Sequence, residues 1–330
     1  MKKIFALLLS AALLVTLLAA CGGGNTTDTD TDAQKPATDA STTQVEEQEP
    51  DTGDASKDDP LNQDEIGEKE LLVVSFGTSY NDSRRETIGA IEKAMQTAFP
   101  DYSVRRAFTS QIIIDHVKDR DGVTIDNVEQ ALERAVDNGV KTLVVQPTHL
   151  MNGLEYKELT DELAKYSDSF EKIAIGAPLL TSDADFEAVM TAITDATKDA
   201  ADGKTAICFM GHGTTADSNS VYSKMQTLLT DKGFNDYYVG TVEATPSLDD
   251  VLAAVQKGSY EKVVLRPLMI VAGDHANNDM AGDEDDSWKS TFEKAGYTVD
   301  CQVEGLGQLE AIQQLFVEHA KAAVASAEAE

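Results

Sequence analysis

Two histidines that lie close to glycines are the residues of this sequence best suited to chemistry. His212 stands between Gly211 and Gly213, after the apolar run at residues 206–210, and His275 ends the sequence Gly-Asp-His. Such a run is typical of a buried parallel strand, and open α/β sheets bind ligands at the carboxyl ends of their strands. A following helix N-terminus would disfavour the imidazolium and leave a neutral ring that binds metal or accepts a proton. Gly211 and Gly213 would let the backbone approach a bulky ligand.

A carboxylate is expected to join the two imidazoles. Glu243, like His212 and His275, follows an apolar run, so all three would project from the same carboxyl edge of a parallel sheet. Two imidazoles and one carboxylate suit a divalent ion such as Co²⁺, Ni²⁺, Fe²⁺ or Zn²⁺, with coordination positions left open. Each residue taken alone could be an ordinary polar group in a loop. Their convergence at one edge favours a metal site.

Short apolar runs alternate with amphipathic stretches of helical length, which predicts an α/β fold with parallel sheets covered by helices. The predicted strands are Leu71–Phe76, Tyr102–Arg105, Thr142–Gln146, Lys172–Ile175, Ala206–Met210, Tyr237–Thr241, Lys262–Leu265 and Thr298–Gln302. The predicted helices are Ser83–Ala98, Thr124–Asn138, Gly153–Lys165, Ser182–Ala200, Ser218–Lys232, Ser247–Lys257, Ser287–Ala295 and Leu309–Ala325.

The two halves of the globular region repeat each other. At an offset of 136, residues 74–79 align with residues 210–215, and at an offset of 120, residues 144–147 align with residues 264–267. This duplication predicts two similar Rossmann-like domains that face one cleft. In the alignment, metal-type side chains are concentrated in the second half: His212, Glu243 and His275 stand opposite Phe76, Ala107 and Glu155.

These patterns set the predicted domain boundaries. We place an N-terminal α/β domain at residues 67–200 and a C-terminal domain carrying the metal site at residues 201–330. The last helix could pack back on the first domain.

Several other residues have two readings. Glu155 could act as a second proton acceptor or guide cations, or it could be an ordinary acid in the first turn of a helix. His149 could line the cleft or pack beside it. Trp288 could cover an aromatic ligand or simply pack in the core. The arginines could clamp a polycarboxylate or be ordinary surface charge, and they are Arg84, Arg85, Arg105 and Arg106.

The first residues predict export. Residues 1–20 have the charged start and apolar run of a signal peptide, and they end in Leu-Ala-Ala before Cys21, which matches a bacterial lipobox. We expect Cys21 to be lipidated and residues 21–66, rich in acids, Thr and Gly, to form a disordered tether. The predicted location is outside the cytoplasm, anchored by lipid to the bacterial cell membrane.

Composition excludes several classes of function. A formal net charge of −31 argues against a nucleic-acid partner and favours attraction of cations. No Walker loop, G-x-G-x-x-G after the first strand or G-x-S-x-G elbow is present, so we expect no nucleotide cofactor. Cys208 and Cys301 are expected to pack as small apolar residues. The sequence leaves self-association into homo-oligomers open.

Four segments resemble the anaerobic cobalt chelatases, the sirohydrochlorin cobaltochelatases of the class II chelatases. They are residues 71–80, 106–110, 209–213 and 267–280, the last reading PLMIVAGDHANNDM. The resemblance implies two α/β domains around a tetrapyrrole cleft. It also implies that His212 is a metal ligand and proton acceptor, that Glu243 and His275 complete the site, and that Glu155 is a cleft acid. We expect further substrate-binding residues at Phe76, Gly77, Thr78, Ser110, Gly211 and Gly213.

The resemblance implies an enzyme that inserts Co²⁺, or Fe²⁺ or Ni²⁺, as a substrate metal into sirohydrochlorin or a related tetrapyrrole. Cobalt insertion for cobalamin biosynthesis is normally cytoplasmic, whereas this sequence predicts a lipoprotein. The alternative is a non-catalytic lipoprotein that binds haem, another tetrapyrrole or metal and passes it to an importer. Metal insertion without an accompanying redox step requires neither a nucleotide nor a redox cofactor.

Overall fold

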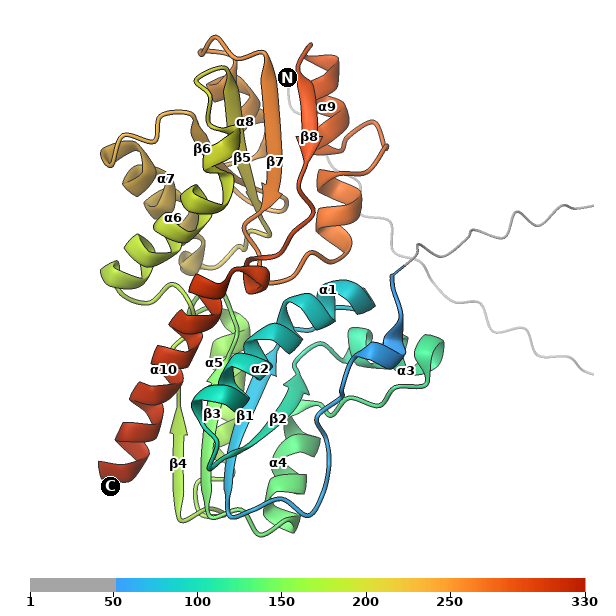
Figure 1. Ribbon diagram of the computed structural model, residues 1–330, viewed down its shortest axis with the longest axis vertical. Coiled ribbons are helices and arrows are strands. Elements are labelled where there is room, and N and C mark those ends of the chain that lie inside the picture. The colour runs from blue at the N-terminus through green and yellow to red at the C-terminus, as the bar shows by residue number, and fades with distance from the viewer. Residues whose placement is uncertain (1–51, 330) are drawn as a thin grey trace, which may run out of the picture. The chain divides into compact units, whose positions relative to one another are not determined.

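Two parallel sheets organise residues 52–329, the part of the chain that this computed structural model describes (Figure 1). The first sheet has the order β2-β1-β3-β4 and the second has the order β6-β5-β7-β8. The strands are β1 Lys69–Ser75, β2 Ser103–Phe108, β3 Thr142–Pro147, β4 Lys172–Ile175, β5 Thr205–Gly211, β6 Tyr237–Thr241, β7 Lys262–Pro267 and β8 Thr298–Cys301. The predicted fold class is confirmed.

The α-helices of this region alternate with the strands. They are α1 Asn81–Glu86, α2 Ile88–Ala98, α3 Gln111–Asp121, α4 Val128–Asp137, α5 Leu154–Ala164, α6 Asp183–Thr197, α7 Ser220–Asp231, α8 Leu248–Val255, α9 Trp288–Lys294 and α10 Glu310–Ala329. Capping boxes start α4, α6 and α8, where an Asn or Ser side chain accepts from the third residue of the helix. Local sequence therefore fixes where these helices begin.

The helix predictions differ from the structure at three places. The helix predicted at Thr124–Asn138 begins only at Val128. The helix predicted at Ser83–Ala98 is broken at Thr87, whose φ and ψ of −112° and −76° separate α1 from α2. The backbone of Thr87 packs so closely on Gly307 that a Cβ at Gly307 would lie 2.9 Å from the Thr87 Cα. Helix α3 is not among the predicted ranges, and its Ile112 side chain is 82% exposed.

The sequence repeat corresponds to a repeat of topology. Strands β1 and β5 start 136 residues apart, at Lys69 and Thr205, and β3 and β7 start 120 residues apart, at Thr142 and Lys262. Strands β1 and β3 are the two central strands of the first sheet, and β5 and β7 are the two central strands of the second. The carboxyl edges of the two sheets are therefore built alike.

One core cluster joins the two sheets. Leu71 and Val73 of β1 belong to the same cluster as Ile207 and Phe209 of β5, together with apolar residues of α6 and α10. Alternate residues of the central strands face other clusters, so both faces of each sheet are buried. Helix α10 leaves the second half and packs against β3, β4, α2 and α6 of the preceding chain.

The segment at residues 52–66 packs on the first sheet, which differs from the predicted tether at residues 21–66. Leu61 is 6% exposed, and its carbonyl accepts hydrogen bonds from the Arg106 backbone and from Arg105 Nε. Thr52 accepts from the Asp82 backbone at the start of α1. The composition of this segment resembles a linker, but long-range partners hold it.

Asp58 connects that segment to two buried arginines. Its carboxylate accepts from Arg84 Nε at 2.6 Å and Arg106 Nη1 at 2.7 Å, and Arg106 also pairs with Glu92. Burial opposes ionisation of Asp58, but the hydrogen bonds and charges of Arg106 and Arg84 hold its pKa below the ordinary value. The four side chains form a buried ion network.

Glu70 of β1 should make stability depend on pH. Its side chain is fully buried, neither carboxylate oxygen has a hydrogen-bond partner, and burial raises its pKa to about 7. The pKa of Glu70 is higher in the folded protein than in the unfolded chain, so the folded state favours the protonated side chain. The resulting stability is fully present below the unfolded pKa of 4.5 and is lost as the pH rises through about 7. Glu70→Gln should therefore raise the free energy of unfolding at pH 8 by roughly 3 kcal/mol.

Denaturant unfolding of Glu70→Gln and wild type at pH 5 and pH 8 measures this effect. The exposed neighbour Glu68 provides a matched control as Glu68→Gln. An equal pH dependence for wild type and Glu70→Gln would show that Glu70 stays ionised in the folded protein.

The predicted signal peptide, Cys21 and the tether up to residue 51 lie outside the described residues. Among residues 52–329, no helix combines the length and apolar character needed to cross a membrane. Cys208 and Cys301 are free thiols in this region, as expected from the sequence.

Candidate metal centre

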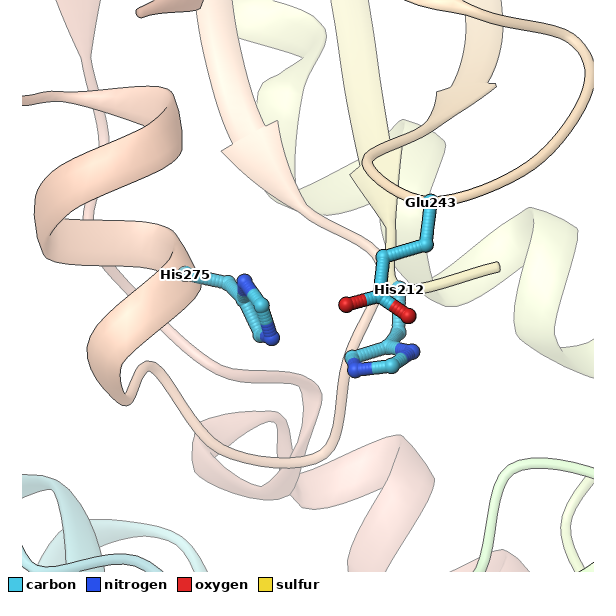
Figure 2. A group of neighbouring side chains, drawn as sticks. All are labelled: His212, Glu243 and His275. Atoms are coloured by element: carbon cyan, nitrogen blue, oxygen red, sulfur yellow. The ribbon is translucent and has the colours of Figure 1, made fainter. Parts of the chain in front are cut away.

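The carboxyl edge of the second sheet brings His212, Glu243 and His275 together. His212 follows β5, Glu243 follows β6, and His275 lies in the segment after β7. One ligand atom from each residue lies within 4.8 Å of the others (Figure 2). The backbone N–H of Glu243 donates to the His212 carbonyl at 2.9 Å, which extends the pairing of β5 with β6 and fixes the two residues side by side.

Both imidazole rings are held through Nδ1. His212 Nδ1 lies 2.8 Å from the Gly213 carbonyl, and His275 Nδ1 lies 2.7 Å from Asp279 Oδ2. The ring centroids are 4.6 Å apart, with the planes at 82°. Since a carbonyl and a carboxylate accept hydrogen bonds, each Nδ1 is the donor in these contacts, and Nε2 is the ring nitrogen left to bind a metal ion.

The first half of the chain supports the loop that carries His275. The Ala272 backbone N–H donates to Ser83 Oγ of α1 at 3.0 Å. A Cβ placed on Gly273 would lie 3.1 Å from Thr78 Oγ1, so Thr78 contacts this loop directly. Residues of both halves therefore determine where His275 lies.

The glycines beside His212 are closely packed against the protein itself. A Cβ on Gly211 would lie 2.1 Å from the Tyr222 ring, and one on Gly213, at a φ of +89°, would lie 2.9 Å from the Ala244 backbone N. Gly77, at a φ of +102°, similarly contacts the Phe108 ring. Protein packing and backbone conformation already require these glycines. Their predicted role in substrate binding stays a prediction.

Other predicted substrate-binding residues lie at the carboxyl edge of the first sheet. Phe76 follows β1 and is 48% exposed, Thr78 is buried, and Ser110 precedes α3. Two further large apolar side chains are exposed after neighbouring strands: Ile112 after β2 at 82% and Leu154 after β3 at 57%. Exposed apolar side chains at the end of a sheet are suited to contact a flat organic ligand.

Glu155 lies outside the three-residue group. It is exposed in the first turn of α5, as its ordinary reading predicted. Burial, with a smaller contribution from the charge of Glu155, raises the pKa of Tyr222, whose hydroxyl accepts from the Gly213 backbone.

His149 is buried rather than exposed to a cleft. It is 7% exposed, neither ring nitrogen has a hydrogen-bond partner, and burial lowers its pKa to about 4. Its ring is therefore neutral. Trp288 is 2% exposed and packs beside Phe292, so its reading as a core residue holds.

The arginines are structural. Arg84, Arg105 and Arg106 are at most 1% exposed and pair with buried acids, which fits neither a carboxylate clamp nor surface charge. Arg85 pairs at the surface with Asp82 and Glu86. In so acidic a chain, these cations neutralise the protein's own carboxylates.

Comparison with solved structures defines the class of fold, that of the class II chelatases. An iron-bound SirB from Bacillus subtilis superposes with a TM-score of 0.57 at 14% identity, covering 80% of this chain and 98% of that one. A cobalt complex of the sirohydrochlorin chelatase SirB from the subspecies spizizenii gives a TM-score of 0.54 at 15% identity, with the same coverage.

The sequence comparisons identify the family. The model of the cobalt chelatase family matches residues 69–325. A sirohydrochlorin cobaltochelatase of Salmonella typhimurium is 38% identical over 251 residues, covering 76% of this chain and 94% of that enzyme. Another, from Nitratidesulfovibrio vulgaris, is 30% identical over 260 residues, covering 78% and 91%. The chain belongs to the cobalt chelatase family.

Two residues at the site were not singled out from the sequence. Asp279 contacts His275, and Tyr222 contacts the Gly213 backbone. The spacing of four residues between His275 and Asp279 was an available signal, since such a pair lies on one face of a helix. Tyr222 lies on α7, and no spacing in the sequence relates it to His212.

Proposed function

We propose that this protein inserts a divalent metal ion, Co²⁺ in the first place and Fe²⁺ or Ni²⁺ by the same chemistry, into sirohydrochlorin or a closely related tetrapyrrole. The observation that carries the proposal is the convergence of His212, Glu243 and His275 within 4.8 Å. Two imidazoles and one carboxylate suit these borderline ions and leave positions open for an incoming ligand. The named activity of the relatives supports the choice of tetrapyrrole and cobalt.

Metal insertion requires an exchange of ligands and the removal of two protons. The metal ion enters as a substrate, loses water and is held by two imidazole Nε2 atoms and the Glu243 carboxylate. The macrocycle lies against the exposed apolar side chains after the first sheet, Phe76, Ile112 and Leu154. Its pyrrole nitrogens replace the protein ligands one by one as their two N–H protons leave.

His212 is the best-placed acceptor for one of those protons. It is exposed, and its Nε2 becomes free when the metal moves to the macrocycle. Glu155, on the facing first half, is the proposed second acceptor. The two protons leave to solvent through these groups, so the product is the neutral metal complex of a dianionic macrocycle core and no electron is transferred.

Multiple turnover tests this function. Residues 52–330 would be incubated anaerobically with excess sirohydrochlorin and Co²⁺, and the conversion followed by absorbance. We expect several equivalents of metallated product per protein at a rate above the protein-free reaction. One equivalent bound, with no insertion above background for Co²⁺, Fe²⁺ or Ni²⁺, would contradict the enzyme and indicate a carrier.

We infer from the lipobox that the protein works outside the cytoplasm on a lipid anchor at Cys21. Cys21→Ser should move the protein from the membrane fraction to the soluble or secreted fraction and abolish labelling by a fatty-acid probe, because a thioether-linked lipid requires the cysteine sulfur. Fractionation with immunodetection measures this. Unchanged membrane association without lipid labelling would show that another element attaches the protein.

A further inference from the structure

Asp279 has no role in the proposed ligand set, yet it contacts one of its members. Its Oδ2 lies 2.7 Å from His275 Nδ1, four residues earlier in the chain. We propose that Asp279 is a positioning residue that holds His275 Nε2 toward the metal and makes His275 the stronger of the two imidazole donors. This inference rests on the proposed function, since it takes His212, Glu243 and His275 to hold the metal.

The local backbone keeps Asp279 available for this contact. Residues Ala276–Met280 form a π-helix, a geometry that often occurs at functional sites. Ala276 and Met280 are fully buried and fix the helix in the core. The intervening side chains are engaged elsewhere, with Asn277 donating to the Gly273 carbonyl at 2.8 Å and Asn278 to Asp274 at 2.7 Å.

The two histidines differ in what their Nδ1–H groups meet. His212 donates to a neutral backbone carbonyl, whereas His275 donates to a carboxylate. A carboxylate acceptor increases electron density on the ring and strengthens Nε2 as a ligand. His275 is therefore the donor that retains the metal, and His212 is the one that releases it and becomes free to accept a proton.

Charge points to the same role. Two neutral rings and the Glu243 carboxylate would leave a divalent ion with a net charge of about +1, and Asp279 supplies the second negative charge next to the ligand set. Asp279 is 44% exposed and His275 is 31% exposed, so solvent moderates this effect without removing it. The site balances the ion while keeping only one carboxylate as a direct ligand.

Two substitutions separate orientation from charge. Asp279→Ala removes both the acceptor and the charge, while Asp279→Asn keeps an acceptor oxygen and removes the charge. We expect Co²⁺ affinity, measured by titration without tetrapyrrole, to fall about 10- to 100-fold in Asp279→Ala and by less in Asp279→Asn. Asp283→Asn is the control. Asp283 lies in the same region but pairs with Lys289, so the Co²⁺ affinity of this variant should match that of wild type.

Ring nitrogen NMR shifts of the metal-free protein test the tautomer directly. In wild type, we expect His275 to carry its proton on Nδ1, and in Asp279→Ala we expect a mixture of tautomers. Circular dichroism checks folding. If Asp279→Ala does not fold, Asp279→Asn and the wild-type shifts still decide the question.

Wild-type Co²⁺ affinity in a folded Asp279→Ala, or an unprotonated Nδ1 on His275 of wild type, would overturn the inference. Failure of the proposed function is a distinct outcome. If wild type inserts no metal but Asp279→Ala still binds Co²⁺ more weakly, the positioning role stands and the chelatase activity does not.

Discussion

His212→Ala is expected to lower the rate of metal insertion at least about 100-fold, the lower end of what a positioned proton acceptor contributes. The substitution removes a metal ligand as well as the acceptor. Glu243 and His275 remain, so residual Co²⁺ binding should persist at lower affinity. Initial rates of Co²⁺ insertion at saturating sirohydrochlorin, together with a Co²⁺ titration, measure both effects.

The matched control is His116→Ala. His116 is an exposed histidine on α3 and is not one of the three grouped residues. The His116→Ala variant should insert Co²⁺ at the wild-type rate. If His212→Ala also retained the wild-type rate and affinity, the site assignment would be wrong.

Asp58→Ala is expected to destabilise the protein by about 3–5 kcal/mol, since removal of one partner leaves buried charges unpaired. Asp58 is the shared partner of Arg84 and Arg106, and both arginines are almost fully buried. Glu92 still neutralises part of the charge of Arg106, so most of the lost stability should come from the unpaired charge of Arg84. Urea unfolding followed by circular dichroism measures the change.

Asp54→Ala is the control within the same segment. Asp54 is exposed and caps a short turn, and its loss should leave the unfolding midpoint close to wild type. Equal midpoints for Asp58→Ala and Asp54→Ala would mean that residues 52–66 dock without contributing to stability. This segment precedes residue 69, where the match to the cobalt chelatase family begins.

The strands and the ligand set could be predicted because their signals are local. Strands β4 and β6 were predicted with their observed bounds, since short runs such as Lys172–Ile175 end at turn residues. His212, Glu243 and His275 each follow such a run, and the parallel arrangement then places them at one edge. The chemical types of the three side chains then indicated a metal site.

What could not be predicted depends on distant contacts. The packing of residues 52–66 requires Asp58 to meet Arg84 and Arg106, partners that lie 26 and 48 positions away. The polar composition of that segment favours disorder until those partners are known. Distant contacts also determine two other features. Gly211, beside His212, contacts Tyr222, and the helix break at Thr87 contacts Gly307.

The central claim is that His212, Glu243 and His275 hold the metal that is inserted. X-ray absorption of Co²⁺ bound to the tetrapyrrole-free protein tests it most directly, with His212→Ala measured in parallel. We predict two imidazole ligands with the remaining positions filled by oxygen in wild type, and one imidazole in the variant. A wild-type spectrum fitted by oxygen ligands alone, or one unchanged by His212→Ala, would contradict the account.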